Sequence, residues 1–275
     1  MCRCWHRRRR TQISLLVPFQ STDVRRLVTW WWLRRYWGYW LPDAEIIIGR
    51  DRKSKRTWYR RHPKPYSKAV AVNNAFRRSH GDIIAILDAD AYLDSAVSTH
   101  CARRIRAAIQ SGVHLWFVPY LHLYRLTPEA SVQIINSSVT NPLVLPTPPP
   151  AKDVEGSEGS GWGHYFGALL QIMPRAAFEK VGGMDPRFRG WGGEDVAFLK
   201  ALDTLWGQHV NTPNDILHLW HPMFMQGTWE DLRGKYWQVR MWGNQTAPRA
   251  NDALASRYHR ANGKPAQMRA LVNES

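Results

Sequence analysis

Short apolar runs alternate with longer, more polar segments along the first 120 residues of this 275-residue chain. The runs at residues 13–17, 45–48 and 83–87 have the length and composition of buried strands. The segments between them, such as 23–36 and 67–79, are long enough to form helices. This alternation is typical of βαβ units and predicts an α/β fold with a mostly parallel central sheet and flanking helices.

The pattern continues with a helix at residues 95–110, which Gly112 closes, and an apolar run at 115–120. We interpret residues 13–120 as a nucleotide-binding half. Residues 141–163 are rich in proline, glycine and charge, so we expect them to form a mobile loop. The remaining expected elements are strands at 169–173 and 216–220 and helices at 174–180 and 195–204.

These expectations divide the chain into three parts. Residues 1–12 form a basic N-terminal segment and residues 13–240 form a single domain. Within that domain, residues 164–240 form the second half. Residues 241–275 are a polar tail, for which we expect peripheral helix or disorder.

Charge and cysteine content limit the partners and the compartment. The chain has 38 Lys and Arg against 22 Asp and Glu, a formal charge of +16. That excess suits phosphate-bearing substrates, nucleic acid or an anionic membrane surface, and a generally basic surface explains it equally well. The three cysteines, Cys2, Cys4 and Cys101, are too few and too scattered for a disulfide framework or a zinc site. We therefore expect a reducing, cytoplasmic environment.

Neither a secretory signal nor a membrane span is expected. The basic start of the chain is not followed by an apolar region with a small-residue cleavage site. Arg34 and Arg35 interrupt the aromatic segment at 28–40, and no stretch approaches the roughly 18 apolar residues of a span. We expect a soluble protein.

Two carboxylates, Asp88 and Asp90, directly follow the apolar run at 83–87. The carboxyl ends of strands are where α/β sheets bind ligands, and a spacing of two along an extended chain points both side chains the same way. Paired hard oxygen ligands suit Mg²⁺ or Mn²⁺ bound together with substrate phosphates. The alternative is an ordinary polar turn after a strand.

A second acidic pair, Glu194 and Asp195, follows two glycines and opens a helix. Acidic residues in a first turn stabilise a helix through its dipole, so a simple helix cap is one interpretation. Trp191 just before the glycines favours a second one, in which a glycine-rich loop moves over a ligand.

His218 and His221 lie at the end of the last expected strand. Either histidine alone is more often an ordinary edge residue than a ligand. Three positions apart in a strand, the two rings would face opposite sides, so we expect only one to complete a metal site.

Tryptophans at residues 30–32, 37 and 40 also have two interpretations. They form either an aromatic surface that docks on a membrane or an acceptor, or the buried face of the first helix. Burial is favoured because a helix that covers a parallel sheet needs a wide apolar face.

In their order along the chain, these motifs resemble those of GT-A glycosyltransferases. Asp88-Ala89-Asp90 is followed by Tyr165-Phe166-Gly167, by Gly182-Gly183-Met184-Asp185, by Trp191-Gly192-Gly193-Glu194-Asp195 and by His218-Leu219-Trp220-His221-Pro222. The sequence is most similar to the β-1,4-galactosyltransferase C-terminal family. Polypeptide N-acetylgalactosaminyltransferases and family 2 enzymes are more distant.

The resemblance implies transfer of a hexose or N-acetylhexosamine from a nucleotide sugar, UDP-linked, to a hydroxyl of a glycan, glycolipid or protein. It implies that Asp88, Asp90 and His221, or alternatively His218, hold Mn²⁺ or Mg²⁺. By the same resemblance Asp195 is the catalytic base. An Asp at this position, where retaining relatives commonly have Asn, favours inversion.

The resemblance assigns residues 164–240 to the acceptor-binding half and divides the remaining site residues between the two substrates. Glu194, Gly193 and Trp191 would bind the acceptor, with Trp191 on the mobile loop. Pro18, Asp51, Lys68, Asn73, Asp88 and Tyr165 would contact the donor. Val72 replaces the arginine of the family 2 pattern, and Lys68 is its possible substitute.

A hypothesis from another class is a catalytically silent domain of this fold that binds nucleic acid or a polyanion through its basic N-terminal and C-terminal segments, with Trp5 and residues 7–10 contacting bases and phosphates. Such a domain has no reason to keep both acidic pairs and His221 together. The enzyme is therefore favoured, and we expect no specific nucleic-acid partner. Peripheral contact with a membrane stays open.

Overall fold

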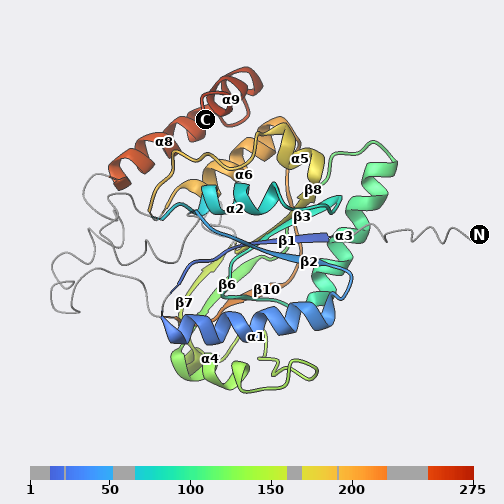
Figure 1. Cartoon of the computed structure of the whole chain (residues 1–275), viewed down its shortest axis with the longest axis vertical. Helices are drawn as coiled ribbons and strands as arrows, with labels where there is room; N and C mark the ends of the chain where they lie inside the picture. The colour runs from blue at the N-terminus through green and yellow to red at the C-terminus, as the bar shows by residue number, and fades with distance from the viewer. Residues whose placement is uncertain (1–12, 22, 52–65, 160–168, 191, 222–246) are drawn as a thin grey trace, which may run out of the picture.

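The computed structural model describes residues 13–21, 23–51, 66–159, 169–190, 192–221 and 247–275 (Figure 1). The strands of the described part are β1 (Ile13–Pro18), β2 (Glu45–Gly49), β3 (Ile83–Leu87), β4 (Ala91–Tyr92), β5 (Phe117–Val118), β6 (His122–Leu126), β7 (Val154–Gly159), β8 (Leu170–Pro174), β9 (Val210–Asn211) and β10 (Asp215–His218). The helices are α1 (Val24–Trp40), α2 (Lys68–Phe76), α3 (Ser95–Gln110), α4 (Pro128–Ile135), α5 (Arg175–Lys180), α6 (Glu194–Leu205), α8 (Ala247–Ala261) and α9 (Pro265–Val272), with a 3-10 turn η2 (Ala151–Asp153).

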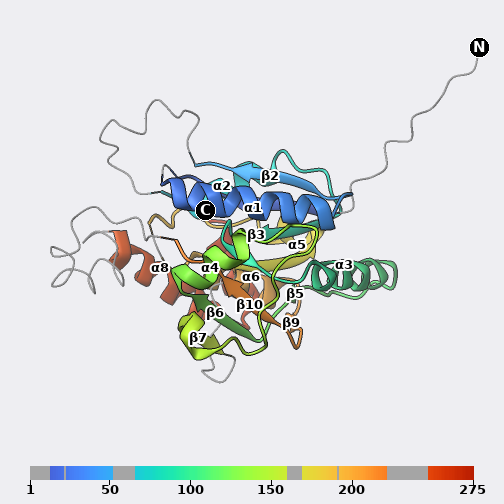
Figure 2. The ribbon, with the colours of Figure 1, turned by 90° about the horizontal axis from the view of Figure 1, so that it is seen from below.

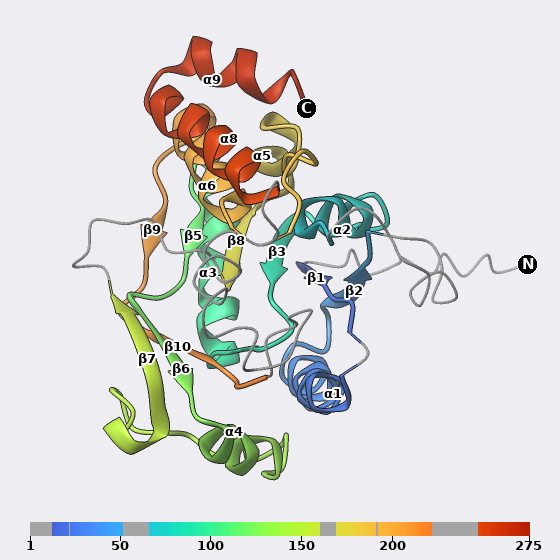
Figure 3. The same ribbon diagram turned by 90° about the vertical axis from the view of Figure 1, so that its left-hand side faces the viewer.

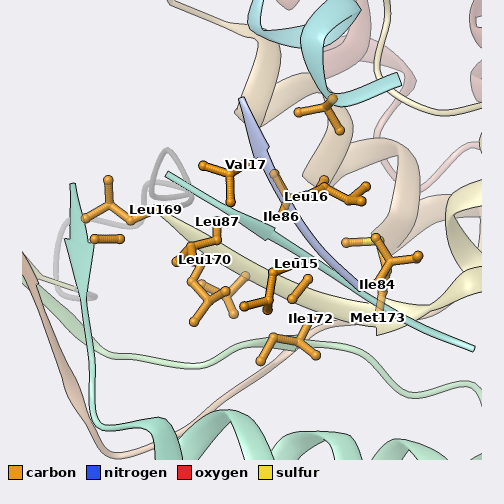
Figure 4. Packing of buried hydrophobic residues seen from close by; sticks show 14 of the residues in the cluster. Leu15, Leu16, Val17, Ile84, Ile86, Leu87, Leu169, Leu170, Ile172 and Met173 are labelled. Carbon is orange, nitrogen blue, oxygen red and sulfur yellow. The ribbon is translucent and has the colours of Figure 1, made fainter. Parts of the chain in front are cut away.

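The larger sheet has six strands in the order β2-β1-β3-β8-β5-β9. Strands β2, β1 and β3 are parallel to one another, as the βαβ pattern predicts, and β5 is parallel to β9. The sheet is mixed because β8 runs antiparallel to both β3 and β5. Apolar side chains of β1, β3 and β8 pack together at its centre (Figure 4). The predicted α/β class with a helix-flanked central sheet is confirmed.

Helices cover both faces of this sheet. In Figures 1 and 3, α2, α5, α6, α8 and α9 lie on one side and α1 lies on the other. Polar side chains define where the helices of the first half begin. Asp23 accepts hydrogen bonds from two amides of the first turn of α1, and Ser67 and Asp94 cap α2 and α3 in the same way. Local sequence thus determines these boundaries.

A second sheet, in the order β4-β10-β6-β7, was not expected. Its edge strand β7 pairs antiparallel with β6, so the expectation of a loop over residues 141–163 is wrong for η2 and β7. Residues 160–163 lie outside the described residues. Glycine and glutamate have low strand propensity, so β7 was not evident from the sequence. The hydrogen bonds that β7 forms along the free edge of β6 outweigh that low propensity.

Of the two alternatives expected for the C-terminal segment, peripheral helix or disorder, the described residues 247–275 show helix. Helices α8 and α9 pack against α6 and against each other. Tyr258, Met268 and Leu271 are buried in that contact. Charged residues are spread along the segment, but it also carries a narrow apolar stripe. Such a stripe stabilises a helix only when it is buried against another surface, and α6 provides that surface.

The tryptophans of α1 are divided between the interior and the surface. Trp30, Trp32 and Trp37 are buried, which confirms the favoured interpretation for three of the five, whereas Trp31 and Trp40 are exposed. Within the described part of the chain, no helix has both the length and the apolar character needed to cross a bilayer.

Candidate functional site

The short pairing of β4 with β10 brings two distant segments together. Asp88 follows the last residue of β3, and Asp90 precedes β4. Strand β4 pairs antiparallel with β10, with His218 opposite Ala91. The amide of Leu219 donates a hydrogen bond to the carbonyl of Asp90 at 2.8 Å. The histidine segment is thereby held against the acidic segment.

Both histidines face the carboxylate of Asp90. The Nε2 of His221 lies 3.0 Å from Asp90 Oδ2, and the Nε2 of His218 lies 3.7 Å from Asp90 Oδ1. The prediction that only one histidine joins this site is wrong. It assumed a strand through residue 220, but β10 ends at His218, so the alternation of side chains no longer applies to His221.

This cluster suits a divalent cation. The ligand atoms of Asp90, His218 and His221 all lie within 4.8 Å of one another. Burial raises the pKa of Asp90, but the two histidines and Arg26 outweigh it and hold that pKa well below its usual value. Burial lowers the pKa of His218 to about 4, against the pull of Asp90. At neutral pH the cluster therefore offers a carboxylate and a neutral imidazole, which are donors that Mn²⁺ accepts.

Asp88 is not part of this cluster, although it was predicted as a metal ligand. Its Oδ1 lies 2.7 Å from the ammonium of Lys68. The turn at residues 89–90 separates the directions of the two aspartates, whereas the prediction assumed an extended chain. Its role as a ligand stays a prediction.

Lys68 connects the two acidic pairs of the sequence. Its Nζ donates to Asp195 Oδ2 at 2.8 Å as well as to Asp88. Burial disfavours the charged amine, but the neighbouring carboxylates outweigh burial, so the pKa of Lys68 lies well above its usual value. Burial raises the pKa of Asp195 to about 7 and that of Asp88 to about 6, with Lys68 opposing both shifts. Lys68 is thus a cation at the centre of the site.

The second acidic pair presents open acceptor atoms. Glu194 Oε2 and Asp195 Oδ1 are both buried, and neither accepts a hydrogen bond from the residues that the structure describes. Buried polar atoms are nearly always paired, because leaving one unpaired costs about 1–3 kcal/mol. The start of α6 thus carries two buried acceptor atoms that have no partner among the described residues.

Gly193 fixes where α6 begins. Its φ of 91° is in the left-handed region, and a Cβ there would lie 3.0 Å from the ring of Phe188 and 3.2 Å from Ala255 of α8. Gly193 therefore shapes the backbone at this point, and its contact with the acceptor stays a prediction. Trp191, the predicted lid residue, lies outside the described residues.

Helix α8 holds the loop that leads into this helix. The buried amide of Asn251 donates to the carbonyls of Arg189 and Gly192, at 2.9 and 3.1 Å, and accepts from the Arg189 amide at 3.2 Å. On the other side, Ser67 donates to the carbonyl of Phe188 at 2.9 Å. The loop is thus bound from two sides before Glu194 and Asp195.

We expect Asn251→Ala to lower the free energy of unfolding by about 2–3 kcal/mol, because three part-buried backbone groups lose their partner. Chemical denaturation of the purified protein measures this. Asp252→Ala, at an exposed position of the same helix, is the matched control and should change stability by less than about 0.5 kcal/mol. Equal losses of stability in the two variants would contradict the role of Asn251 in holding the loop at residues 189–192.

Several residues predicted to contact the donor have partners within the protein, and their contact with the donor stays a prediction. Pro18 ends β1, and Asp51 accepts a hydrogen bond from the amide of Ser67 at 3.1 Å. Asn73 instead makes two hydrogen bonds to the backbone of Met184, at 2.7 and 3.0 Å. These bonds hold the glycine turn before Asp185, so Asn73 serves the structure there. Tyr165 lies outside the described residues.

Two residues of the site were missed from sequence. Arg26, on the first turn of α1, donates to Asp90 at 3.3 Å. The hydroxyl of Tyr66 is buried without a hydrogen-bond partner among the described residues, and burial, followed by Asp51, raises its pKa. The signal for Arg26 was its place in the first helical turn after β1, because such turns lie at the ligand-binding edge of a parallel sheet.

Two glycosyltransferase family models match parts of the chain. The family 2 glycosyltransferase model matches residues 44–119, which include Lys68, Asp88 and Asp90. The model described as the N-terminal domain of galactosyltransferase matches residues 158–217, which include Glu194 and Asp195. The predicted resemblance to glycosyltransferases is confirmed, and at that level the chain is a glycosyltransferase enzyme. No curated protein matches it in sequence.

Solved structures resemble the chain only weakly. The catalytic domain of Drosophila β-1,4-galactosyltransferase 7, in complex with xylobiose, is 13% identical with a TM-score of 0.37, covering 80% of this chain and 78% of its own. A Pyrobaculum calidifontis mannosyltransferase with GDP-Man and Mn²⁺ is 12% identical with a TM-score of 0.45, covering 96% and 73%. Mycobacterium tuberculosis glucosyl-3-phosphoglycerate synthase with Mn²⁺ and UDP-glucose is 11% identical with a TM-score of 0.41, covering 84% and 77%.

Proposed function

We propose that this protein transfers a hexose or N-acetylhexosamine from a UDP-sugar to an acceptor hydroxyl, with inversion at the anomeric carbon. The observation that carries the proposal is the meeting of two separate acidic segments in one site. Lys68 bridges Asp88 and Asp195, and Asp90 of the same turn faces two histidines. Each acidic segment lies within its own glycosyltransferase family match.

The donor side of the site is assigned to the acidic turn and its cations. Asp90, His218 and His221 would hold Mn²⁺, or Mg²⁺, with Asp88 as a further predicted ligand. When bound, the ion supplies positive charge that stabilises the departing diphosphate. Lys68 and Arg26 add fixed positive charge next to the same two aspartates.

The acceptor side is assigned to the start of α6. Glu194 accepts a hydrogen bond from the acceptor at its open Oε2, and Asp195 Oδ1 accepts the proton of the attacking hydroxyl. The hydroxyl oxygen forms the new bond to the anomeric carbon while the bond from that carbon to the diphosphate oxygen breaks. The electron pair leaves with the diphosphate, and attack from the opposite face inverts the configuration.

A panel of nucleotide sugars tests the proposal directly. We expect the purified protein to hydrolyse or transfer from at least one UDP-sugar when Mn²⁺ is present, and EDTA should abolish this activity. Mn²⁺ is the first ion to test because similar structures were solved with it. If no donor reacts and the protein instead binds RNA or heparin, the hypothesis of a silent polyanion-binding domain replaces the enzyme.

The acceptor and the compartment belong to the same proposal. Glycans, glycolipids and proteins all present hydroxyl groups, which can donate hydrogen bonds to the unpartnered carboxylate oxygens of Glu194 and Asp195. We place the protein in the cytoplasm, which the low cysteine content supports. Cys101 is buried in α3, and burial raises the pKa of its thiol to about 12, so it remains a neutral thiol.

A further inference from the structure

One helix carries most of the exposed apolar side chains of the described residues. Six of the ten large hydrophobic residues that are exposed in the described ranges belong to α1. They are Val24, Leu27, Val28, Trp31, Tyr39 and Trp40. Val24 and Trp31 are 68% and 60% exposed. A single exposed apolar residue is ordinary, but a cluster of this kind marks an interaction surface.

Four of these six residues form a stripe over the first two turns of α1, and Tyr39 lies on the same side beyond the exposed Arg35. At about 100° per residue, Val24, Leu27, Val28, Trp31 and Tyr39 fall within roughly a third of the helix circumference. The opposite side of α1 packs into the core through other residues, among them Trp30, Leu33 and Trp37. Helix α1 lies at the edge of the molecule beside α4 (Figures 1 and 2). A surface helix normally has a polar outer face, and α1 has an apolar one.

The charges on α1 are all positive. The helix contains Arg25, Arg26, Arg34 and Arg35 and no Asp or Glu. Arg25 and Arg34 are exposed at the two borders of the stripe, and the guanidinium of Arg35 lies 4.6 Å from the ring centre of Trp31. Arginines in such positions extend along an apolar surface and keep their charge at its polar boundary.

We propose that this stripe of α1 docks on the surface of an anionic lipid bilayer. Apolar side chains with Trp and Tyr, bordered by arginine, are the composition of helices that lie in a membrane interface. Anionic headgroups would pair with the exposed Arg34 and Arg35, whereas Arg25 and Arg26 already contact Asp23 and Asp90. Pairing α1 with α1 of a second copy would instead oppose arginines with no acidic partner on either helix. Nucleic acid would satisfy the arginines but leave Val24, Leu27 and Val28 in water.

The docking surface is connected to the site by the same helix. Arg26, the residue before Leu27, donates to Asp90 from the inner side of α1. A bilayer on the outer side would therefore fix the orientation of the site relative to the membrane surface.

Sedimentation of the full chain with vesicles tests the proposal. We expect binding to phosphatidylcholine vesicles that contain phosphatidylglycerol, and at least about tenfold weaker binding to phosphatidylcholine alone. Leu27→Glu with Trp31→Glu should reduce binding to the anionic vesicles by at least about a hundredfold. Ile109→Glu with Val113→Glu is the matched control, because these residues are 48% and 54% exposed at the far end of α3.

Removing the arginines gives an independent readout. Arg34→Gln with Arg35→Gln should weaken binding by about fivefold for each charge and reduce its dependence on salt. Circular dichroism and the melting temperature establish that each variant is folded. Absence of vesicle binding by the wild type, or equal losses in the α1 and α3 pairs, would overturn the proposal. If the wild type does not bind vesicles but forms a concentration-dependent dimer, and Leu27→Glu with Trp31→Glu abolishes that dimer, the stripe is the contact with a second copy instead.

Discussion

Replacing Asp195 with asparagine is expected to lower the rate of sugar transfer by about three orders of magnitude, while UDP and Mn²⁺ bind nearly as before. Asparagine keeps the size of the side chain and one oxygen for Lys68, but it cannot accept the proton of the acceptor hydroxyl. The metal cluster on Asp90 is a separate group of side chains and is not altered. Initial rates with the best donor of the panel, together with calorimetric titration of UDP, measure the two effects.

Two further variants identify the base unambiguously. Asp252→Asn makes the same chemical change at an exposed position of α8 and should leave the rate unchanged. Glu194→Gln should raise the KM for the acceptor more than it lowers kcat, because Glu194 is assigned to binding. Full activity of Asp195→Asn would contradict its assignment as the base. If Glu194→Gln instead lowers kcat strongly and Asp195→Asn mainly raises the KM for the acceptor, Glu194 is the base and Asp195 binds the acceptor.

The pH dependence of kcat provides a second readout of the same base. Burial raises the pKa of Asp195 to about 7, and only its deprotonated form accepts a proton. The rate should therefore fall as the pH drops below about 7. Lys68 opposes the shift, so Lys68→Met should move the acidic limb to higher pH if the variant remains folded.

Replacing Asp90 with alanine is expected to abolish Mn²⁺-dependent binding of UDP, with a loss of at least about a hundredfold in metal affinity. Second-sphere changes alone cost about 10 to 100-fold at metal sites, and Asp90 is the one carboxylate of the three-residue cluster. Titration of Mn²⁺ followed by its electron paramagnetic resonance measures binding without reference to activity. The rise in melting temperature that Mn²⁺ gives the wild type should disappear.

The histidines and the neighbouring aspartate refine this result. His218→Ala and His221→Ala should each weaken Mn²⁺ binding, because both rings face Asp90. Asp252→Ala is the control on a distant helix. If the wild type binds UDP equally well with Mn²⁺ and with EDTA, the metal assignment is wrong. If Asp88→Asn weakens Mn²⁺ binding as much as Asp90→Ala, the predicted pair of aspartate ligands is supported.

Local sequence was enough to predict the first half of the fold. The apolar runs that became β1, β2 and β3 and the helix over Ser95–Gln110 were found from periodicity and turn residues alone. Asp23, Ser67 and Asp94 cap their helices through bonds to amides two or three residues away. Such interactions involve neighbours in the chain, so the sequence contains all the information that they require.

Long-range pairing was beyond the same approach. The sequence predicted β10 too long, so it placed His218 and His221 on opposite sides of a strand. It also missed β7, because an edge strand of glycine, serine and glutamate forms only where β6 offers free hydrogen-bonding groups. In both cases the deciding contact lies 28 or more residues away in the chain.

The sequence by itself determined the βαβ alternation, the positions of the two acidic pairs at the ends of secondary structure elements, and the glycosyltransferase resemblance. Only the tertiary structure decided which of these residues share a site. It separated Asp88 from Asp90, joined Asp88 to Asp195 through Lys68, and bound the loop before Glu194 to Asn251. The physical reason is that burial brings these charges and amides together away from water, where each needs a partner that spacing along the chain does not reveal.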